Sequence, residues 1–314
     1  MKEQSRWPWI AFTAVCIFWG TTAPAIRLAV RYFPPLQLSG VRFALAGALL
    51  LVVLMALGQG PTHWGVALQR SIPGGLSLAL ANALTCIGFQ TVPSAHGALI
   101  LATTALLMTL IDSLWLTNRR RAAPLTWPGL LLGLAGVALL FDVPHAWQGP
   151  MQGSLILLLS SLCWAFGSVW QSRHPSHLPP ILEAALQMLI ASVVLLPVSR
   201  IIGERWNPDV PVSGWLAFVF LVLTGSLIGF VAFVFILRTL PPKIVALYTY
   251  INPIVATGAG WWWLGERVGG RFWLACATIL GSVALVRYAE LRASIRVRPG
   301  SAVDSTIPPL EPLT

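Results

Sequence analysis

Apolar residues follow one another along this chain in stretches of about twenty, and short connections rich in proline, glycine and arginine separate them. A helix needs about 20 apolar residues to cross a hydrocarbon core of roughly 30 Å, because each residue adds about 1.5 Å. The pattern therefore predicts ten membrane-spanning helices. Their expected ranges are 8–29, 36–57, 72–92, 95–117, 124–142, 152–172, 180–201, 213–237, 243–264 and 270–289.

The chain is also internally repeated. Trp19 and Pro35 in the first half return 145 residues later as Trp164 and Pro180. A duplicated set of apolar helices is typical of transporters, in which two related halves rock about a central site. We therefore predict two five-helix domains. They are expected to cover residues 8–142 and 152–289.

The positive charges orient the predicted helices. With ten spans both chain ends lie on one side, and placing them in the cytoplasm puts thirteen Lys and Arg residues there and six on the other side. Cytoplasmic connections usually carry this excess. Since each domain has an odd number of spans, the two enter the membrane in opposite orientations. The predicted fold is an all-α integral protein of the cytoplasmic membrane, with ten transmembrane helices in two inverted five-helix repeats. The polar residues 290–314 are expected to form a disordered cytoplasmic tail.

The composition supports a membrane protein and argues against other classes. Charged residues make up 10% of the chain and hydrophobic ones 56%, whereas a soluble domain carries about 25% charged residues. The net charge of +10 would suggest nucleic acid in a soluble protein, but here the arginines lie in connections, where they face anionic lipid. The four cysteines sit in apolar stretches without CxxC spacing, and the histidines show no metal-binding pattern. We predict no metal, no other cofactor and no nucleic-acid partner.

Short motifs in both halves resemble the EamA-type domain of the drug/metabolite transporter superfamily. The resemblance covers nearly all of residues 8–289 and implies ten helices in two inverted halves, a central cavity and export of small organic metabolites. In the first half, Ala105 stands where the pattern has a proline and Asn118 where it has an acid. The motifs are Phe18-Trp19-Gly20-Thr21, Pro34-Pro35, Arg42-Phe43-Ala44, Leu237-Arg238-Thr239-Leu240-Pro241-Pro242, Ala246, Pro253 and Leu264-Gly265-Glu266-Arg267.

Three ionisable residues inside the predicted spans are functional candidates, because a charge facing lipid costs several kcal/mol. Arg42 could bind a carboxylate or phosphate of the substrate; alternatively, it snorkels to the interface or caps backbone carbonyls. Asp112 and Glu183 are possible proton sites. Both are expected near water at span ends, where a structural role competes with proton transfer.

Neutral polar residues mark two helix faces that could bind a solute. Asn82 lies in the third span, one turn before Thr85. In the ninth span Tyr248 and Asn252 are one turn apart and precede Pro253. Proline removes a backbone hydrogen bond, so the carbonyl one turn earlier is a candidate ligand. The alternative for both faces is interhelical hydrogen bonding that holds the bundle together.

Trp19 and Trp164 are repeat-mates that lie about half-way through their spans, away from the interfaces where tryptophan usually gathers. They could line a cavity and stack on an apolar or cationic solute, or simply pack against neighbouring helices.

These observations favour a secondary transporter that moves a small organic metabolite, such as an amino acid, by alternating access. It could be an exporter or a facilitator. The sequence contains no Walker motif for ATP coupling. A polytopic membrane enzyme acting on a lipid-soluble substrate is the alternative, but it would need a catalytic cluster, and no HExxH, GxSxG or Asp-rich motif occurs. We therefore expect a transporter rather than an enzyme, with a small-molecule substrate and membrane lipid as its partners.

The predicted topology can be tested by cysteine labelling in intact cells. Pro144→Cys and Asp209→Cys place a thiol in outer connections and should react with an impermeant reagent. Arg120→Cys lies in a cytoplasmic connection and should react only after the membrane is opened. The reverse pattern would contradict both the orientation and the inverted repeat.

Overall fold

The computed structural model describes residues 6–115, 126–139, 150–206, 209–240, 245 and 248–296. Every element of secondary structure in these ranges is a helix. A bilayer offers no water to the backbone, and a helix satisfies its own N–H and C=O groups within one segment. The bilayer therefore accounts for both the apolar sequence and the helical fold.

The first half contains five helices, two of which are made of several segments. The first helix includes a π-helical turn, and the fourth is interrupted at Thr103, whose N–H bonds to the Ile100 carbonyl three residues back. The segments are α1 (Trp7–Ala14), η1 (Val15–Trp19), α2 (Gly20–Ala29), α3 (Pro35–Ala56), α4 (Trp64–Gly88), α5 (Ser94–Ala102), α6 (Thr104–Trp115) and α7 (Thr126–Ala138).

The second half repeats this order, and its π-helical segment lies in its third helix. The repeat-mates α3 and α9 both begin at the second proline of a Pro-Pro pair. Proline lacks a backbone N–H, but the first N–H of a helix has no acceptor within the helix, so no hydrogen bond is lost there. The segments are α8 (Pro150–Arg173), α9 (Pro180–Ile201), α10 (Val212–Phe220), η3 (Leu221–Phe230), α11 (Val231–Thr239), α13 (Tyr248–Leu264) and α14 (Gly270–Arg296).

The predicted ten-helix architecture is confirmed in the described part of the chain, where seven helices have the length and hydropathy of a membrane span. The range 72–92 for the third span is wrong, since α4 runs from Trp64 to Gly88. The prediction placed Arg70 outside the span, in the preceding cytoplasmic connection. In the structure α4 contains Arg70, whose guanidinium reaches the Ser176 carbonyl at 2.9 Å.

The predicted tail also begins too early. Helix α14 continues to Arg296, so residues 290–296 are helical. Positively charged side chains at the last turn of a helix are favoured by its dipole, so arginines in this segment are compatible with helix. Residues 297–314 of the predicted tail lie outside the described residues.

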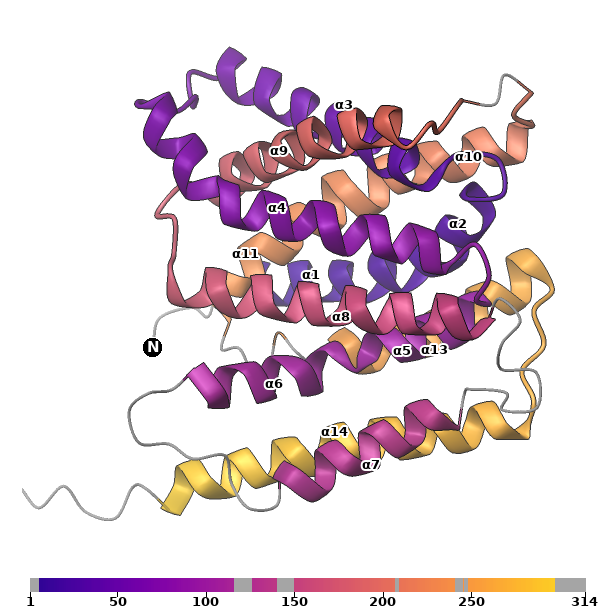
Figure 1. The fold of residues 1–314 in the computed structure, drawn as a ribbon. Coiled ribbons are helices and arrows are strands. Elements are labelled where there is room, and N and C mark those ends of the chain that lie inside the picture. The colour runs from indigo at the N-terminus through magenta and orange to yellow at the C-terminus, as the bar shows by residue number, and fades with distance from the viewer. Residues whose placement is uncertain are drawn as a thin grey trace, which may run out of the picture.

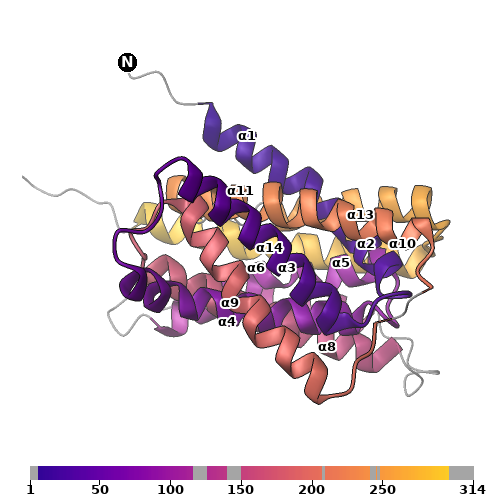
Figure 2. The same cartoon turned by 90° about the horizontal axis from the view of Figure 1, so that it is seen from above.

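The two halves run in opposite directions. Figure 1 shows α1 and α2 crossing the bundle from left to right, whereas α8 crosses from right to left. The start of α1 and the end of α14 lie at the same end of the bundle, which we call the terminal side; the other end is the opposite side. Seen from above, α1 diverges from the other helices at its start, and it contains no buried residue (Figure 2).

Helices of the two halves pack directly against each other. The α3 helix lies along α9, and α4 lies along α8 and α9. Glycine allows this approach: a Cβ atom on Gly47 would lie 2.9 Å from the Ala185 carbonyl oxygen of α9. The α7 and α14 helices pair along one side of the bundle (Figure 1). The centre of the molecule is therefore formed by helices from both halves.

Two glutamates of the second half cap helices of the first half on the opposite side. The Glu266 carboxylate accepts hydrogen bonds from the Ser94 N–H (3.0 Å) and hydroxyl (2.6 Å) at the start of α5. The Glu204 carboxylate accepts from the backbone N–H groups of Leu36 (3.2 Å) and Gln37 (3.0 Å) at the start of α3. A negative charge at a helix N-terminus satisfies orphan donors and complements the helix dipole.

Replacing one of these carboxylates should loosen the contact between the halves. Glu266→Gln leaves a single acceptor oxygen for the donors at the start of α5, so we expect a loss of about 1–3 kcal/mol in stability. Thermal unfolding of the purified protein in detergent measures it. Arg267→Gln changes the next, exposed residue and is the control. Equal unfolding temperatures for the two variants would contradict the capping role.

Candidate solute cavity

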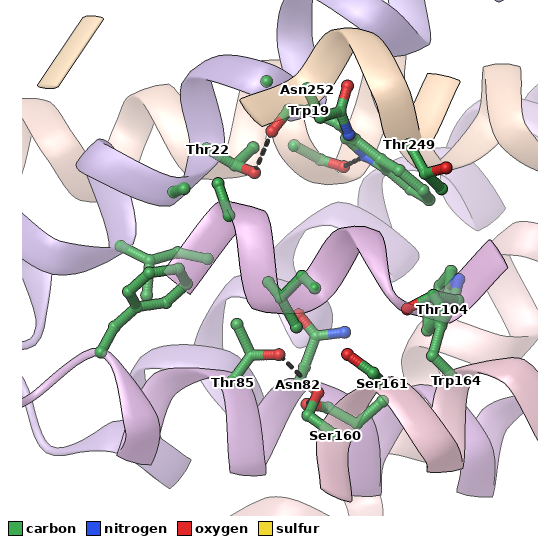
Figure 3. A pocket seen from close by; sticks show the side chains of 18 of the residues that line it. Trp19, Thr22, Asn82, Thr85, Thr104, Ser160, Ser161, Trp164, Thr249 and Asn252 are labelled. Atoms are coloured by element: carbon green, nitrogen blue, oxygen red, sulfur yellow. Dashed lines mark hydrogen bonds between the residues drawn. The ribbon is translucent and has the colours of Figure 1, made fainter. Parts of the chain in front are cut away.

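A cavity of about 160 Å³ lies at the centre of the bundle, where the halves meet. The first half lines it with the first helix and with α3, α4, α5 and α6, and the second half with α8, η3 and α13. Figure 3 shows polar side chains of α4 and α8 on one wall and those of α2 and α13 on the facing wall. The labelled polar side chains are Asn82, Thr85, Ser160 and Ser161 on the first wall and Thr22, Thr249 and Asn252 on the second.

All six residues predicted from the sequence to bind the solute line this cavity. They come from five helices that are distant in sequence, and the fold brings them together. Whether each contacts a solute stays a prediction. The six residues are Trp19, Arg42, Asn82, Trp164, Tyr248 and Asn252.

Arg42 is enclosed by the protein and does not snorkel. Its side chain is 4% exposed, and its Nη2 donates to the Asn82 side-chain oxygen at 2.7 Å. The guanidinium carbon lies 4.5 Å from the centre of the Phe43 ring. Its buried Nε has no hydrogen-bond partner in the described part of the chain. The cavity wall therefore contains a guanidinium whose donors are only partly used.

Hydroxyl groups join α4 to α8 on the same wall as Asn82 (Figure 3). The Thr85 and Ser160 hydroxyls are 2.7 Å apart, and Ser160 also donates to the Ala81 carbonyl at 2.7 Å. Each hydroxyl can accept as well as donate. The wall thus combines one cation with neutral groups that can turn their hydrogen bonds toward a bound molecule.

Aromatic rings cluster along one part of the cavity wall. The ring centre of Trp19 lies 5.6 Å from that of Trp164, 4.8 Å from Phe233 and 5.5 Å from Tyr248. The α11 helix, which carries Phe233, ends on the terminal side (Figure 1), and Tyr248 is the first residue of α13. The cluster of these four rings gives the cavity an apolar floor. This arrangement is compatible with both roles expected for Trp19 and Trp164, plain packing and stacking on a solute.

The floor depends on two π-helical segments that sequence reasoning missed. Segment η1 ends at Trp19, whose indole N–H donates to the Gly225 carbonyl of η3 at 3.0 Å. A Cβ atom on Gly229 would lie 2.5 Å from the indole nitrogen, so only glycine leaves room for the ring. π-Helical turns are rare and often occur at functional sites. Apart from the four-residue spacing of Gly225 and Gly229, the sequence carries no signal for them.

Asn252 holds α13 against the first helix. Two carbonyl oxygens face its side-chain amide, those of Cys16 at 3.2 Å and Tyr248 at 3.1 Å, so the amide nitrogen must point toward them. Interhelical bonding, the structural alternative for this residue, is therefore present, while the residue also lines the cavity. Pro253 lies inside α13, and Thr249, one turn before it, is a lining residue as well.

The two candidate proton sites lie outside the cavity wall. Asp112 pairs with Arg173 at 2.6 Å, and its side chain is 52% exposed. Glu183 is 5% exposed and is bonded to Arg238 and, at 3.2 Å, to the Gln187 amide. The expectation that Glu183 lies beside water is wrong, because the connection before α9 and the end of α11 enclose it. Arg238 bonds to Ser176 and Leu178 of that connection.

A duplicated, inverted bundle of apolar helices around a central cavity with several polar groups in its wall is typical of membrane transporters. The comparison with known families agrees. The model of the EamA-like transporter family matches the chain twice, at residues 6–142 and 151–288, and the chain belongs to this family. The two matches correspond to the two halves of the fold.

Relatives resemble the chain over almost its whole length. It is 36% identical over 277 residues to the inner membrane transporter YedA of Escherichia coli K12, covering 88% of this chain and 89% of YedA. The transporter YvbV of Bacillus subtilis is 28% identical over 280 residues, covering 86% and 88%. A solved crystal structure superimposes with a TM-score of 0.65 at 26% identity, covering 93% of this chain and 100% of the other.

Substitutions of Tyr248 and Asn252 in α13 test whether this predicted pair contacts the solute. Tyr248→Phe removes one hydroxyl and should raise the apparent KM for transport several-fold with an unfolding temperature near that of the wild type. Asn252→Ala should also raise KM, with a stability loss of about 0.6–2 kcal/mol from the broken interhelical bond. Tyr288→Phe, at a 46% exposed position on α14, is the control. Normal transport by both variants would assign the pair a structural role.

Proposed function

We propose that the chain is a secondary transporter that moves a small organic metabolite, such as an amino acid, across the cytoplasmic membrane. It works by alternating access, as an exporter or facilitator, with both termini in the cytoplasm. The observation that carries the proposal is the central cavity, because side chains from both inverted halves line it. A solute bound there would contact both moving bodies at once.

Contacts between the halves at the two ends of the bundle support alternating access. On the terminal side, Asp112 of the first half pairs with Arg173 of the second. On the opposite side, Glu204 and Glu266 hold helix starts of the first half. These contacts are polar, so their groups can exchange partners with water when one end opens. Rocking of the halves would open one end while the other stays closed.

Counterflow in liposomes tests the transport proposal. Liposomes containing the purified protein are loaded with one unlabelled compound and diluted into a trace of the same compound in labelled form. The assay is repeated for each member of a panel of amino acids and other small metabolites. At least one label should accumulate transiently above protein-free liposomes. Accumulation of none would contradict the proposal.

A matched pair of substitutions connects the flux to the cavity. Ala102 is 3% exposed and lines the cavity, so Ala102→Phe should fill it and abolish counterflow. Ala135 lies on the exposed face of α7, and Ala135→Phe should retain counterflow. Equal flux in the two variants would show that the solute does not pass through this cavity.

The position of the carboxylates leads to a prediction about coupling. The described cavity wall contains no Asp or Glu, and both candidate proton sites are held in ion pairs on the terminal side. An imposed pH gradient should therefore change initial rates modestly and should not drive accumulation. Counterflow at equal pH should proceed well. Strong proton-driven accumulation that is lost in Asp112→Asn or Glu183→Gln would contradict this.

A further inference from the structure

The guanidinium of Arg42 is the charge in the cavity that the protein leaves unbalanced. Among the described residues that line the cavity, Arg42 is the basic one, and none is acidic. An arginine side chain does not lose its proton in proteins, so the charge is present at any physiological pH. The position equivalent to Arg42 in the second half is Gln187, which is neutral and bonds to Gln171 at 2.7 Å.

Four acidic residues of the described helices and caps, none of which lines the cavity, are engaged elsewhere. Glu183 pairs with Arg238 and Asp112 with Arg173. The carboxylates of Glu204 and Glu266 bond to the starts of α3 and α5. Arg42 itself bonds to a neutral amide oxygen, and its Nε is buried without a partner in the described ranges.

Building on the proposed function, we infer that the transported solute carries a carboxylate that binds Arg42. A buried charge is costly unless an opposite charge and hydrogen bonds compensate it. The planar guanidinium offers paired N–H donors that match the two oxygens of a carboxylate. A carboxylate also has the right charge, since a single guanidinium balances one negative charge. The doubly charged phosphate of a monoester would leave one charge uncompensated.

The rest of the cavity complements this end of the solute. The Thr85 and Ser160 hydroxyls lie on the same wall as Asn82, the bonding partner of Arg42 (Figure 3). The Trp19 and Trp164 rings form the aromatic floor. An apolar body, or an amino group held against ring faces, fits a floor of this kind. The solute class is therefore a small monocarboxylate, with or without an amino group.

Four matched probes measure the selectivity of the site. They share one branched alkyl body and differ at one end: 4-methylpentanoate, 4-methylpentanamide, 3-methylbutylamine and 3-methylbutyl phosphate. Binding to the purified protein is followed by the fluorescence of tryptophan, since Trp19 and Trp164 line the cavity. The carboxylate should bind at least tenfold more tightly than each of the other three.

Asn82→Asp is the decisive variant. It changes the Arg42 partner from an amide to a carboxylate of the same shape, so the protein neutralises its own guanidinium. The folded state gains an ion pair but loses the hydrogen bond that the Asn82 amide donates to the Leu78 carbonyl at 3.2 Å, so the unfolding temperature should change little. Affinity for 4-methylpentanoate should drop at least tenfold, and affinity for the amide should stay the same. Arg42→Gln should lose the same selectivity. Gln90→Glu adds an equal charge at an exposed position outside the cavity wall and should leave the selectivity intact.

Several results would overturn the inference: no saturable binding of the carboxylate, equal or tighter binding of the amide, amine or phosphate, or a carboxylate preference that survives Asn82→Asp. Counterflow of the same probes separates this inference from the transport proposal. Carboxylate binding without flux would uphold the anion site and contradict transport. Flux of the amine or amide without carboxylate binding would uphold transport and overturn the anion site.

Discussion

Polar groups packed between the helices of this bundle are shielded from bulk water, so the chain itself must satisfy most of them, and this requirement explains much of the structure. The backbone is helical because a helix satisfies its own donors and acceptors. The starts of α3 and α5 are capped by Glu204 and Glu266 from the other half. Glu183 is buried only together with Arg238. Several buried neutral side-chain atoms also lack a partner in the described ranges, but Arg42 is the charged side chain among these exceptions, and it lines the central cavity.

The same requirement makes the two halves complementary. The first half has Asn118 at the position equivalent to Glu266, where the EamA-type pattern has an acidic residue. In the structure, Glu266 does not act within its own half but caps α5 of the first half. Arg42 and Gln187 differ in a similar way: Arg42 presents a charge to the cavity, and the Gln187 amide donates to Gln171 and Glu183 near the terminal side. The second half thus supplies the capping glutamates, and the first half supplies the positive charge in the cavity wall.

Much of this architecture could be predicted from the sequence, because membrane helices and a long-period repeat leave strong local signals. Six of the residues that line the cavity were also predictable, because charged, amide and aromatic side chains at mid-span stand out from the apolar sequence around them. The π-helical segments and the interruption at Thr103 were not, because they depend on packing such as that of Trp19 against Gly229. The burial of Glu183 was missed because the covering residues, such as Ser176 and Arg238, are brought together only by the tertiary fold.

The central claim is that one cavity opens to each side of the membrane in turn. Thr104 is 4% exposed and lines the cavity, so Thr104→Cys places a reporter thiol there. Its reaction with an impermeant thiol reagent can be measured separately in intact cells and in inverted membrane vesicles, above the background of the four native cysteines. Alternating access predicts labelling from both sides. Labelling from one side alone, with complete protection from the other, would contradict the account.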